Sequence, residues 1–259
     1  MAKEKMPYYL IAIIGVGGTG GNFAKEFCRY FASLKKDVKE HIRIAFVDGD
    51  MVEEKNCSRQ PFTEEDVHMN KAAILAEAVG DALGVDVSAY PHYIDSAEEL
   101  KDLFTALASK ANTYLSNSNV VPVLCGCVDN HRARQVMDEF YSSRSTCIYY
   151  DAANEFAQGE VVFGVRIKGN EISPPRKFYF PEVMTDKGKS KSEEGCGVVN
   201  ISSPQHLATN LMSANILLSA CVQLISDHKV SDGIVHFDAF RYYVRAESFL
   251  KHQKKGQTL

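Results

Sequence analysis

The stretch YYLIAIIGVGGTGGNFAKEF at residues 8–27 decides the fold. Its first seven residues form an apolar run rich in isoleucine, which is typical of a buried strand. Five glycines follow closely: Gly15, Gly17, Gly18, Gly20 and Gly21. Aromatic residues then recur at helical spacing from Phe23 to Phe31. The stretch therefore predicts a strand, a tight turn and a helix in succession.

The spacing of Gly15, Gly17 and Gly20 is typical of a turn that binds a nucleotide phosphate. Glycine lets the backbone approach an anion closely, and the first turn of a helix offers N–H groups without partners. A plain glycine turn in another α/β protein has the same spacing, but here the strand before it and the helix after it supply the required context. We therefore predict a nucleotide site at this turn, with Gly18 as a further member.

A second apolar strand is expected at residues 41–48, and it ends in Asp48-Gly49-Asp50. In a dinucleotide-binding fold an acidic residue at this point accepts hydrogen bonds from a ribose hydroxyl. Asp and Gly are also ordinary turn formers, so Asp48 alone is equally compatible with a solvated turn. The long separation from the glycines fits a long first helix, which we expect at residues 18–36.

The segment behind Asp50 carries further polar residues, which a dehydrogenase does not normally have there: Asn56, Arg59, Gln60 and Lys71. Asn70 is placed to cap a helix that begins at Lys71. The helix dipole disfavours a lysine in the first turn unless an anion needs it. Such a local conflict is expected at a functional site.

Five separated motifs occur in a fixed order along the chain: GVGGTG at 15–20, VDGD at 47–50, NCSRQ at 56–60, Lys71, and DNHRAR at 129–134. This order resembles the ThiF/MoeB and ubiquitin-activating-enzyme family of ATP-dependent adenylyltransferases. The compact chain is similar to the stand-alone prokaryotic members of that family. The resemblance covers residues 8 to about 165, where a return strand follows a turn at Gly159.

The resemblance implies that ATP activates a carboxylate as an acyl-adenylate and that pyrophosphate is released. It implies that Arg59 and Lys71 neutralise the phosphates, that Asp129 holds Mg²⁺ and that Asp48 binds the ribose. The nucleotide-binding set that it implies is Gly15, Gly17, Gly18, Gly20, Asp48, Asp50, Asn56, Arg59, Gln60, Lys71 and Asn130. Two anions meet in this reaction, so the chemistry also requires cations and a metal. We expect these groups in a pocket at the carboxyl ends of the first, second and fourth strands.

Cys196 lies in a segment at residues 168–199 that is rich in Pro, Gly, Lys and Glu. The resemblance makes this segment a flexible crossover that closes over the substrate tail. In several relatives a cysteine here or nearby takes over the activated acyl group, so Cys196 is a candidate catalytic nucleophile. Glu193 and Glu194 disfavour a thiolate, and an incidental cysteine is the equal alternative.

Two departures from the family keep other functions open. Residues 1–9 lack the arginine that many relatives carry there, which leaves a catalytically silent nucleotide-binding scaffold as one alternative. An NAD(P)-dependent oxidoreductase would use the same glycine turn and Asp48, but it leaves Arg59, Lys71 and Asp129 unexplained. The zinc-binding cysteine pairs of many relatives are also absent.

The carboxylate partner stays open between a ubiquitin-like or sulfur-carrier protein ending in Gly-Gly, a peptide and a small carboxylate.

The composition bounds the partners and the compartment. A chain of 259 residues with 45% hydrophobic residues fits one large domain. The formal net charge of -4 gives no support for a nucleic-acid partner. We find no run of 18 apolar residues and no signal peptide, so we expect no membrane span. Seven cysteines at irregular spacing fit reduced thiols and a cytoplasmic protein.

We therefore expect a single ThiF-type domain over residues 1–259, with an α/β Rossmann-like fold: a mostly parallel central sheet with helices on both faces. Residues 1–167 form its nucleotide-binding part, and residues 200–259 supply a C-terminal helix and strands. Antiparallel strands at 159–167 and 233–247 extend one edge of the sheet. The apolar helix at 203–228 contains small residues that permit close packing, and we expect a homodimer.

Overall fold

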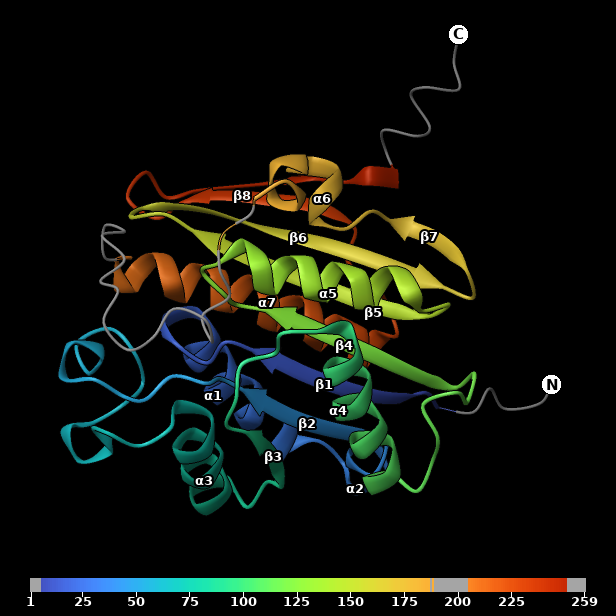
Figure 1. Ribbon diagram of the computed structural model, residues 1–259, viewed down its shortest axis with the longest axis horizontal. Helices are drawn as coiled ribbons and strands as arrows, with labels where there is room; N and C mark the ends of the chain where they lie inside the picture. The colour runs from blue at the N-terminus through green and yellow to red at the C-terminus, as the bar shows by residue number, and fades with distance from the viewer. Residues whose placement is uncertain (1–5, 187, 189–204, 251–259) are drawn as a thin grey trace, which may run out of the picture.

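The computed structural model describes residues 6–186, 188 and 205–250, which form one open sheet with helices on both faces (Figure 1). Within these residues the parallel strands are, in spatial order, β3 (Val87–Tyr90), β2 (Ile42–Val47), β1 (Tyr8–Ile14), β4 (Val120–Gly126) and β5 (Cys147–Asn154). Antiparallel strands then continue the sheet: β6 (Gln158–Ile167), β8 (Gly233–Asp238) and β9 (Tyr243–Glu247), with β7 (Asn170–Ser173) paired to β6. The predicted fold class is confirmed, including the antiparallel extension.

Each face of the sheet has its own hydrophobic core. Helices α1 (Gly18–Ser33), α3 (Lys71–Leu83) and α7 (Leu207–Asp227) cover one face, and α4 (Ala97–Lys110) and α5 (His131–Ser143) cover the other. Alternate residues of β1 enter the two cores, since Ile11 and Ile13 join one cluster and Leu10 and Ala12 join the other. A strand covered on both faces must be apolar throughout, which explains the continuous apolar run of β1.

The first helix is shorter than we expected. It ends at Ser33 rather than near Lys36, because Leu34 and Lys35 both adopt extended backbone conformations. Leu34 packs against the core at this break, and the short helix α2 (Lys36–Lys39) follows. A partly buried leucine within a charged stretch therefore interrupts a pattern that by itself favours a continuous helix.

The segment expected as a flexible crossover at 168–199 begins with regular elements. After β7, residues 176–184 form α6 (Arg176–Tyr179) and the 3₁₀ turn η3 (Pro181–Met184). The Gln135 amide on α5 donates hydrogen bonds of 2.8 Å to the carbonyls of Val183 and Asp186, so this part is anchored on α5. Residues 187 and 189–204, which include Cys196, lie outside the described part of the chain. Movement of the segment remains a prediction.

Helix α7 was expected at 203–228 and is described from Leu207 to Asp227. Among the described helices it is long and apolar enough to cross a membrane, but half of its apolar stretch is buried. It packs on α1, β5 and β6, as a core helix of a globular fold does.

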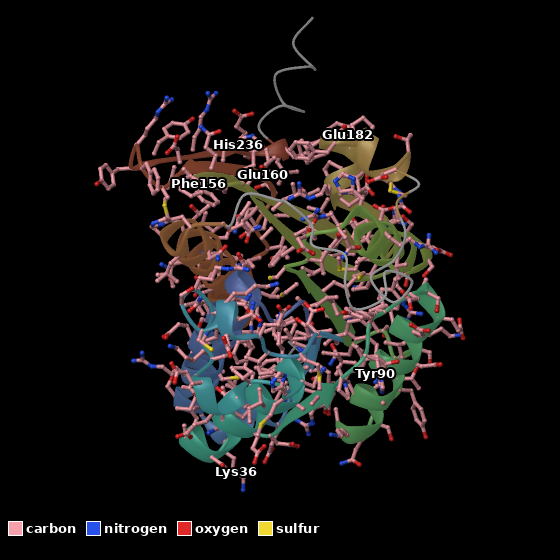
Figure 2. The ribbon with its side chains drawn as sticks, turned by 60° about the vertical axis from the view of Figure 1, so that its left-hand side comes forward. Lys36, Tyr90, Phe156, Glu160, Glu182 and His236 are labelled. Carbon is pink, nitrogen blue, oxygen red and sulfur yellow. The ribbon has the colours of Figure 1, made fainter. Side chains whose placement is uncertain are left out.

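Figure 2 shows Lys36 and Tyr90 at the β2–β3 end of the molecule, and Phe156, Glu160 and His236 at the antiparallel end.

Candidate functional site

The glycine turn lies between β1 and α1, beside the end of β4. Gly15 has a φ of +83°, and a Cβ there would lie 2.9 Å from the carbonyl oxygen of Cys127. A Cβ on Gly20 would lie 1.8 Å from the Gly15 carbonyl oxygen, so both positions require glycine. The strand order reverses between β1 and β4, which is where ligands bind in open α/β sheets.

The start of α1 presents backbone N–H groups rather than a side-chain cap. Gly17 precedes the helix, no described side chain caps it, and its first turn contains no acidic residue. The N–H groups of that turn carry the positive end of the helix dipole and have no intrahelical partners. The turn can therefore bind a phosphate through its backbone.

Asp48 is part of this turn rather than a solvated residue. Its carboxylate accepts hydrogen bonds from the N–H of Val16 at 2.8 Å and from the N–H of Asp50 at 2.9 Å. Burial and the nearby Asp50 carboxylate raise the pKa of Asp48, against the opposing effects of Lys71 and the two N–H groups. A carboxylate has about four acceptor sites, so Asp48 retains capacity for a ribose hydroxyl.

Lys71 is buried at the start of α3, and an acidic partner explains its position. Its Nζ lies 3.0 Å from Oδ2 of Asp50, and the side chain of Lys71 is only 6% exposed. Tyr93 donates a hydrogen bond from its hydroxyl to the same Asp50 carboxylate. Asn70 caps α3 as predicted and also donates to the Asp48 carbonyl at 2.9 Å. These contacts bring the start of α3 to the end of β2.

The segment between β2 and α3 places Gln60 and Arg59 near the turn. The position of a Cβ on Gly17 would be 3.6 Å from Nε2 of Gln60, so Gln60 lies against the glycine turn. Arg59 is the preceding residue and is half-buried. Asn56 is almost fully buried, and its Oδ1 accepts the Glu53 N–H at 2.9 Å in the cap of η1 (Glu54–Asn56). The buried Asn56 side chain therefore stabilises the backbone conformation of this segment.

The loop between β4 and α5 carries the predicted metal ligand. The N–H of Cys127 donates to the Ile14 carbonyl at 2.8 Å, which fixes this loop beside the glycine turn. Asp129 follows two residues later and is exposed. The Asn130 side chain accepts the Ala133 N–H at 2.8 Å and so caps α5.

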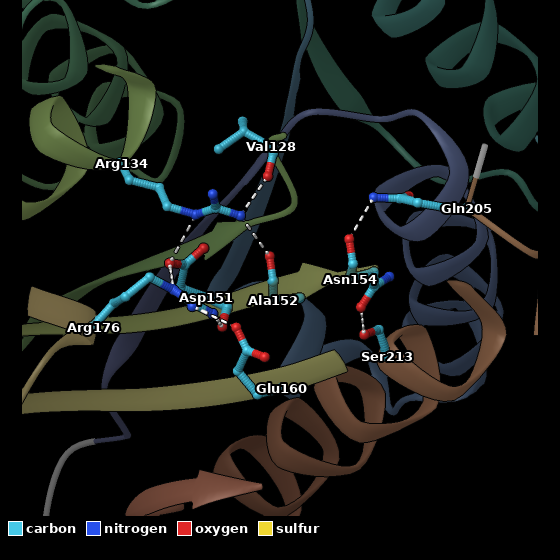
Figure 3. A network of polar contacts seen from close by, with 9 residues as sticks. All are labelled: Val128, Arg134, Asp151, Ala152, Asn154, Glu160, Arg176, Gln205 and Ser213. Carbon is cyan, nitrogen blue, oxygen red and sulfur yellow. Dashed lines mark hydrogen bonds and ion pairs between the residues drawn. The ribbon is translucent and has the colours of Figure 1, made fainter. Parts of the chain in front are cut away.

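Arg134 contacts this loop from the protein interior. It is buried, and its Nη2 donates to the carbonyls of Val128 at 2.6 Å and Ala152 at 3.2 Å (Figure 3). Its Nε lies 3.3 Å from the Asp151 carboxylate, which is also buried. Arg134 is thus engaged inside the protein rather than directed at a ligand.

The structure brings most of the predicted site together at one edge of the sheet. The turn itself consists of Gly15, Gly17, Gly18 and Gly20, and a series of contacts links it to Asp48, Asp50, Gln60 and Lys71. Asp129 and Asn130 lie in the adjacent loop, and Arg59 lies beside Gln60. The described residues contain no cluster of three or more metal-ligating side chains. A single exposed carboxylate fits Mg²⁺, which often binds through one carboxylate and substrate phosphates.

A buried polar network next to the turn was not predicted from the sequence. Asn154 donates to Oγ1 of Thr19 at 2.7 Å, and Thr19 donates to Oδ1 of Asn210 at 3.2 Å. A Cβ on Gly18 would lie 2.2 Å from the Asn210 amide nitrogen, so α7 approaches α1 closely at this glycine. The sequence signal was polar residues on one face of an apolar helix, at Asn210 and Ser213.

Comparison with known proteins agrees with this arrangement. The ThiF family model matches residues 3–258. Ubiquitin-like modifier-activating enzyme 5 of Oryza sativa subsp. japonica is 28% identical over 137 residues, which are 52% of this chain and 30% of that protein. This chain therefore spans less than a third of that curated relative.

Solved structures share the fold at low sequence identity. PaaA superposes with a TM-score of 0.62 at 14% identity, over 94% of this chain and 64% of PaaA. E. coli MccB solved with ATP superposes with a TM-score of 0.60 at 13% identity, over 93% of this chain and 63% of MccB. Since the family model extends over nearly the entire sequence and the motifs meet at one edge of the sheet, this chain belongs to the ThiF family.

Proposed function

We propose that this protein is an ATP-dependent adenylyltransferase that joins a substrate carboxylate to the α-phosphate of ATP and releases pyrophosphate. One observation carries the proposal: Asp48 and the Lys71–Asp50 pair lie against an uncapped glycine turn, beside the loop with Asp129. This is an anion site with a ribose acceptor, a buried cation and a carboxylate for a metal. Membership of the ThiF family supports the assignment.

Each residue has a role that follows from its position. The N–H groups at the start of α1 bind phosphate, and Asp48 accepts a hydrogen bond from the ribose. Lys71 and Arg59 offset the negative charge where the carboxylate meets the phosphate. Asp129 would hold Mg²⁺, which supplies further charge neutralisation when it is bound.

The reaction needs no general base, because the attacking carboxylate is already ionised at neutral pH. The protein therefore acts by positioning two anions and by stabilising the charge of the transition state. Both effects depend on groups held rigidly in advance. The buried Lys71 and the hydrogen-bonded Asp48 meet that requirement.

The substrate class we propose is a C-terminal carboxylate of a small carrier protein ending in Gly-Gly or of a peptide. E. coli MccB has been solved with its partner MccA, and the rice relative is named for activating a ubiquitin-like modifier. Cys196 would act only after the acyl-adenylate exists, by accepting the acyl group.

The test is exchange of labelled pyrophosphate into ATP in the presence of candidate carriers or peptides. Arg59→Ala and Asp129→Ala are each expected to abolish exchange, whereas Cys196→Ala is expected to retain it. Lys55→Ala is the matched control, because Lys55 lies in the same segment but is exposed, and its ammonium pairs with the exposed Glu53 at 2.7 Å. Near-normal exchange by the Arg59 and Asp129 variants would disprove their assignment.

The same preparation separates the two alternatives. Calorimetric titration with ATP and with NADH decides whether the glycine turn prefers a nucleoside triphosphate or a dinucleotide. Tight ATP binding without exchange for any carboxylate tested would indicate a catalytically silent scaffold. Preference for NADH would indicate an oxidoreductase.

A further inference from the structure

A buried ionic network links the segment after β7 to the core of the sheet. Arg176 on α6 is 4% exposed, and its Nε donates to Oδ2 of Asp151 (Figure 3). Its Nη2 donates to the Asp151 carbonyl at 3.1 Å, and its Nη1 donates to Glu160 on β6 at 2.7 Å. The guanidinium also lies 5.0 Å from the ring centre of Phe180. Arg176 is therefore held on every side by this network.

The same Asp151 oxygen continues the network toward the nucleotide site. Oδ2 of Asp151 lies 3.3 Å from Nε of Arg134, whose Nη2 donates to the Val128 carbonyl at 2.6 Å. Val128 directly precedes Asp129. An unbroken series of contacts thus runs from α6 through Asp151 and Arg134 to the loop that carries Asp129.

The backbone is shaped to accommodate this arrangement. Asp151 pairs in register with Gly126, the last residue of β4, and a Cβ on Gly126 would lie 2.8 Å from Oδ1 of Asp151. Two guanidinium groups face two carboxylates, of which Asp151 is buried and Glu160 is partly exposed, so the charges of the network balance. Removing one member leaves an uncompensated charge in the interior, and the remaining groups must rearrange.

We infer that Asp151 and Arg176 are positioning residues for the nucleotide site, which act through Arg134 on the loop that carries Asp129. The inference rests on the proposed function only where it takes Asp129 as the Mg²⁺ ligand. In this inference the contact between Arg176 on α6 and Asp151 keeps the loop that carries Asp129 in the conformation that binds the metal. Outer-shell partners of metal ligands act in this way.

The experiment uses the full chain with Arg176→Gln, which keeps a polar side chain but loses the charge. Arg166→Gln is the matched control. Arg166 on β6 also pairs with a glutamate, Glu171 at 3.0 Å, donates to the Ser142 carbonyl at 2.9 Å and lies 5.1 Å from the Tyr141 ring. None of these contacts involves Asp151 or the loop before α5.

Two readouts are compared in both variants. The first is hydrogen–deuterium exchange of peptides covering residues 127–131, which needs neither nucleotide nor metal. The second is the Mg²⁺ concentration for half-maximal pyrophosphate exchange. Arg176→Gln is expected to speed deuterium uptake in the loop and to raise the Mg²⁺ requirement by up to about tenfold, the lower end of the effect of losing a direct outer-shell partner, because Arg176 acts through Asp151 and Arg134. Arg166→Gln is expected to change neither.

Unchanged deuterium uptake in the loop of Arg176→Gln, relative to Arg166→Gln, would overturn the inference. If Arg176→Gln does not fold, Arg176→Lys takes its place, because it keeps the charge but lacks the planar guanidinium whose separate nitrogens bond Asp151 and Glu160. It is expected to give a smaller change in the same direction, and no change would again overturn the inference. A loosened loop with an unchanged Mg²⁺ requirement would instead refute Asp129 as the ligand, and with it that part of the proposed function.

Discussion

Lys71 is a buried cation in the first turn of α3, where the helix dipole disfavours it and the Asp50 carboxylate compensates its charge. We predict that Lys71→Met lowers the free energy of unfolding by about 2 kcal/mol, since it removes the buried cation that lies between the carboxylates of Asp50 and Asp48 and the helix. It should also weaken ATP binding. Urea denaturation and calorimetric titration measure the two effects.

The double variant Lys71→Met/Asp50→Asn separates these two effects. It also removes the Asp50 charge that repels Asp48, so it is expected to recover most of the lost stability but not the ATP binding. Recovery of ATP binding together with stability would mean that Lys71 serves only to neutralise Asp50.

Gly18 tests the close contact between α1 and α7. A Cβ there would lie 2.2 Å from the Asn210 amide nitrogen, so Gly18→Ala is expected to cost about 1–3 kcal/mol, as overpacked cores do. Adding Asn210→Ala removes the obstructing amide and is expected to restore part of this stability. Thermal unfolding of the two variants is the measurement, and equal destabilisation in both would contradict the contact.

The cysteines differ in expected reactivity because their burial differs. Burial raises the pKa of Cys28 to about 12, whereas Cys57 is half-buried. At pH 8 a thiol with a pKa near 12 is ionised in about one molecule in ten thousand. In a Cys196→Ala background we predict that iodoacetamide modifies Cys57 well before Cys28. Labelling of Cys28 should rise only as the pH approaches 12, and equal rates at pH 8 in folded protein would contradict this.

At the scale of single elements, helix α5 shows a structural role for a residue first assigned to ATP. Asn130 caps α5 through the Ala133 N–H. We predict that Asn130→Ala costs about 1 kcal/mol of stability, the usual value of an N-cap, and lowers pyrophosphate exchange. Asn130→Ser can also cap the helix, so it is expected to restore both the stability and the exchange.

Ser96→Ala provides the control for this prediction, because Ser96 caps α4 in the same way through the Glu99 N–H at 3.3 Å. It should cost similar stability with no effect on exchange. If Asn130→Ser is stable but inactive, Asn130 contacts the nucleotide as the family resemblance implies.

At the scale of the whole molecule, the assembly and location of the protein are still predictions. We predict a homodimer, because family members of this size usually pair and because α7 keeps Leu207 and Leu211 exposed at its start. Light scattering at micromolar concentration measures the mass, and a monomer would contradict the prediction. A cytoplasmic location and the lack of nucleic-acid or membrane partners also stay predictions.

Much of the fold could be predicted because its signals are local. The apolar run of β1, the glycines of the turn and the cap at Asn70 act over a few residues, so spacing alone identifies them. The alternation of strands and helices through residue 151 follows from the same periodicity. The position of Asp48 at the turn followed from the rule that parallel strands end at one edge.

The sequence by itself therefore determined the strand–turn–helix at residues 8–27, the α/β class and the edge of the sheet that holds the motifs. Only the tertiary structure decided which polar side chains make contacts in the protein interior, because their partners are distant in sequence. Gly18 meets Asn210 across 192 positions, and Arg176 reaches Asp151 across 25. No local pattern specifies such pairs, since burial and the fold together select them.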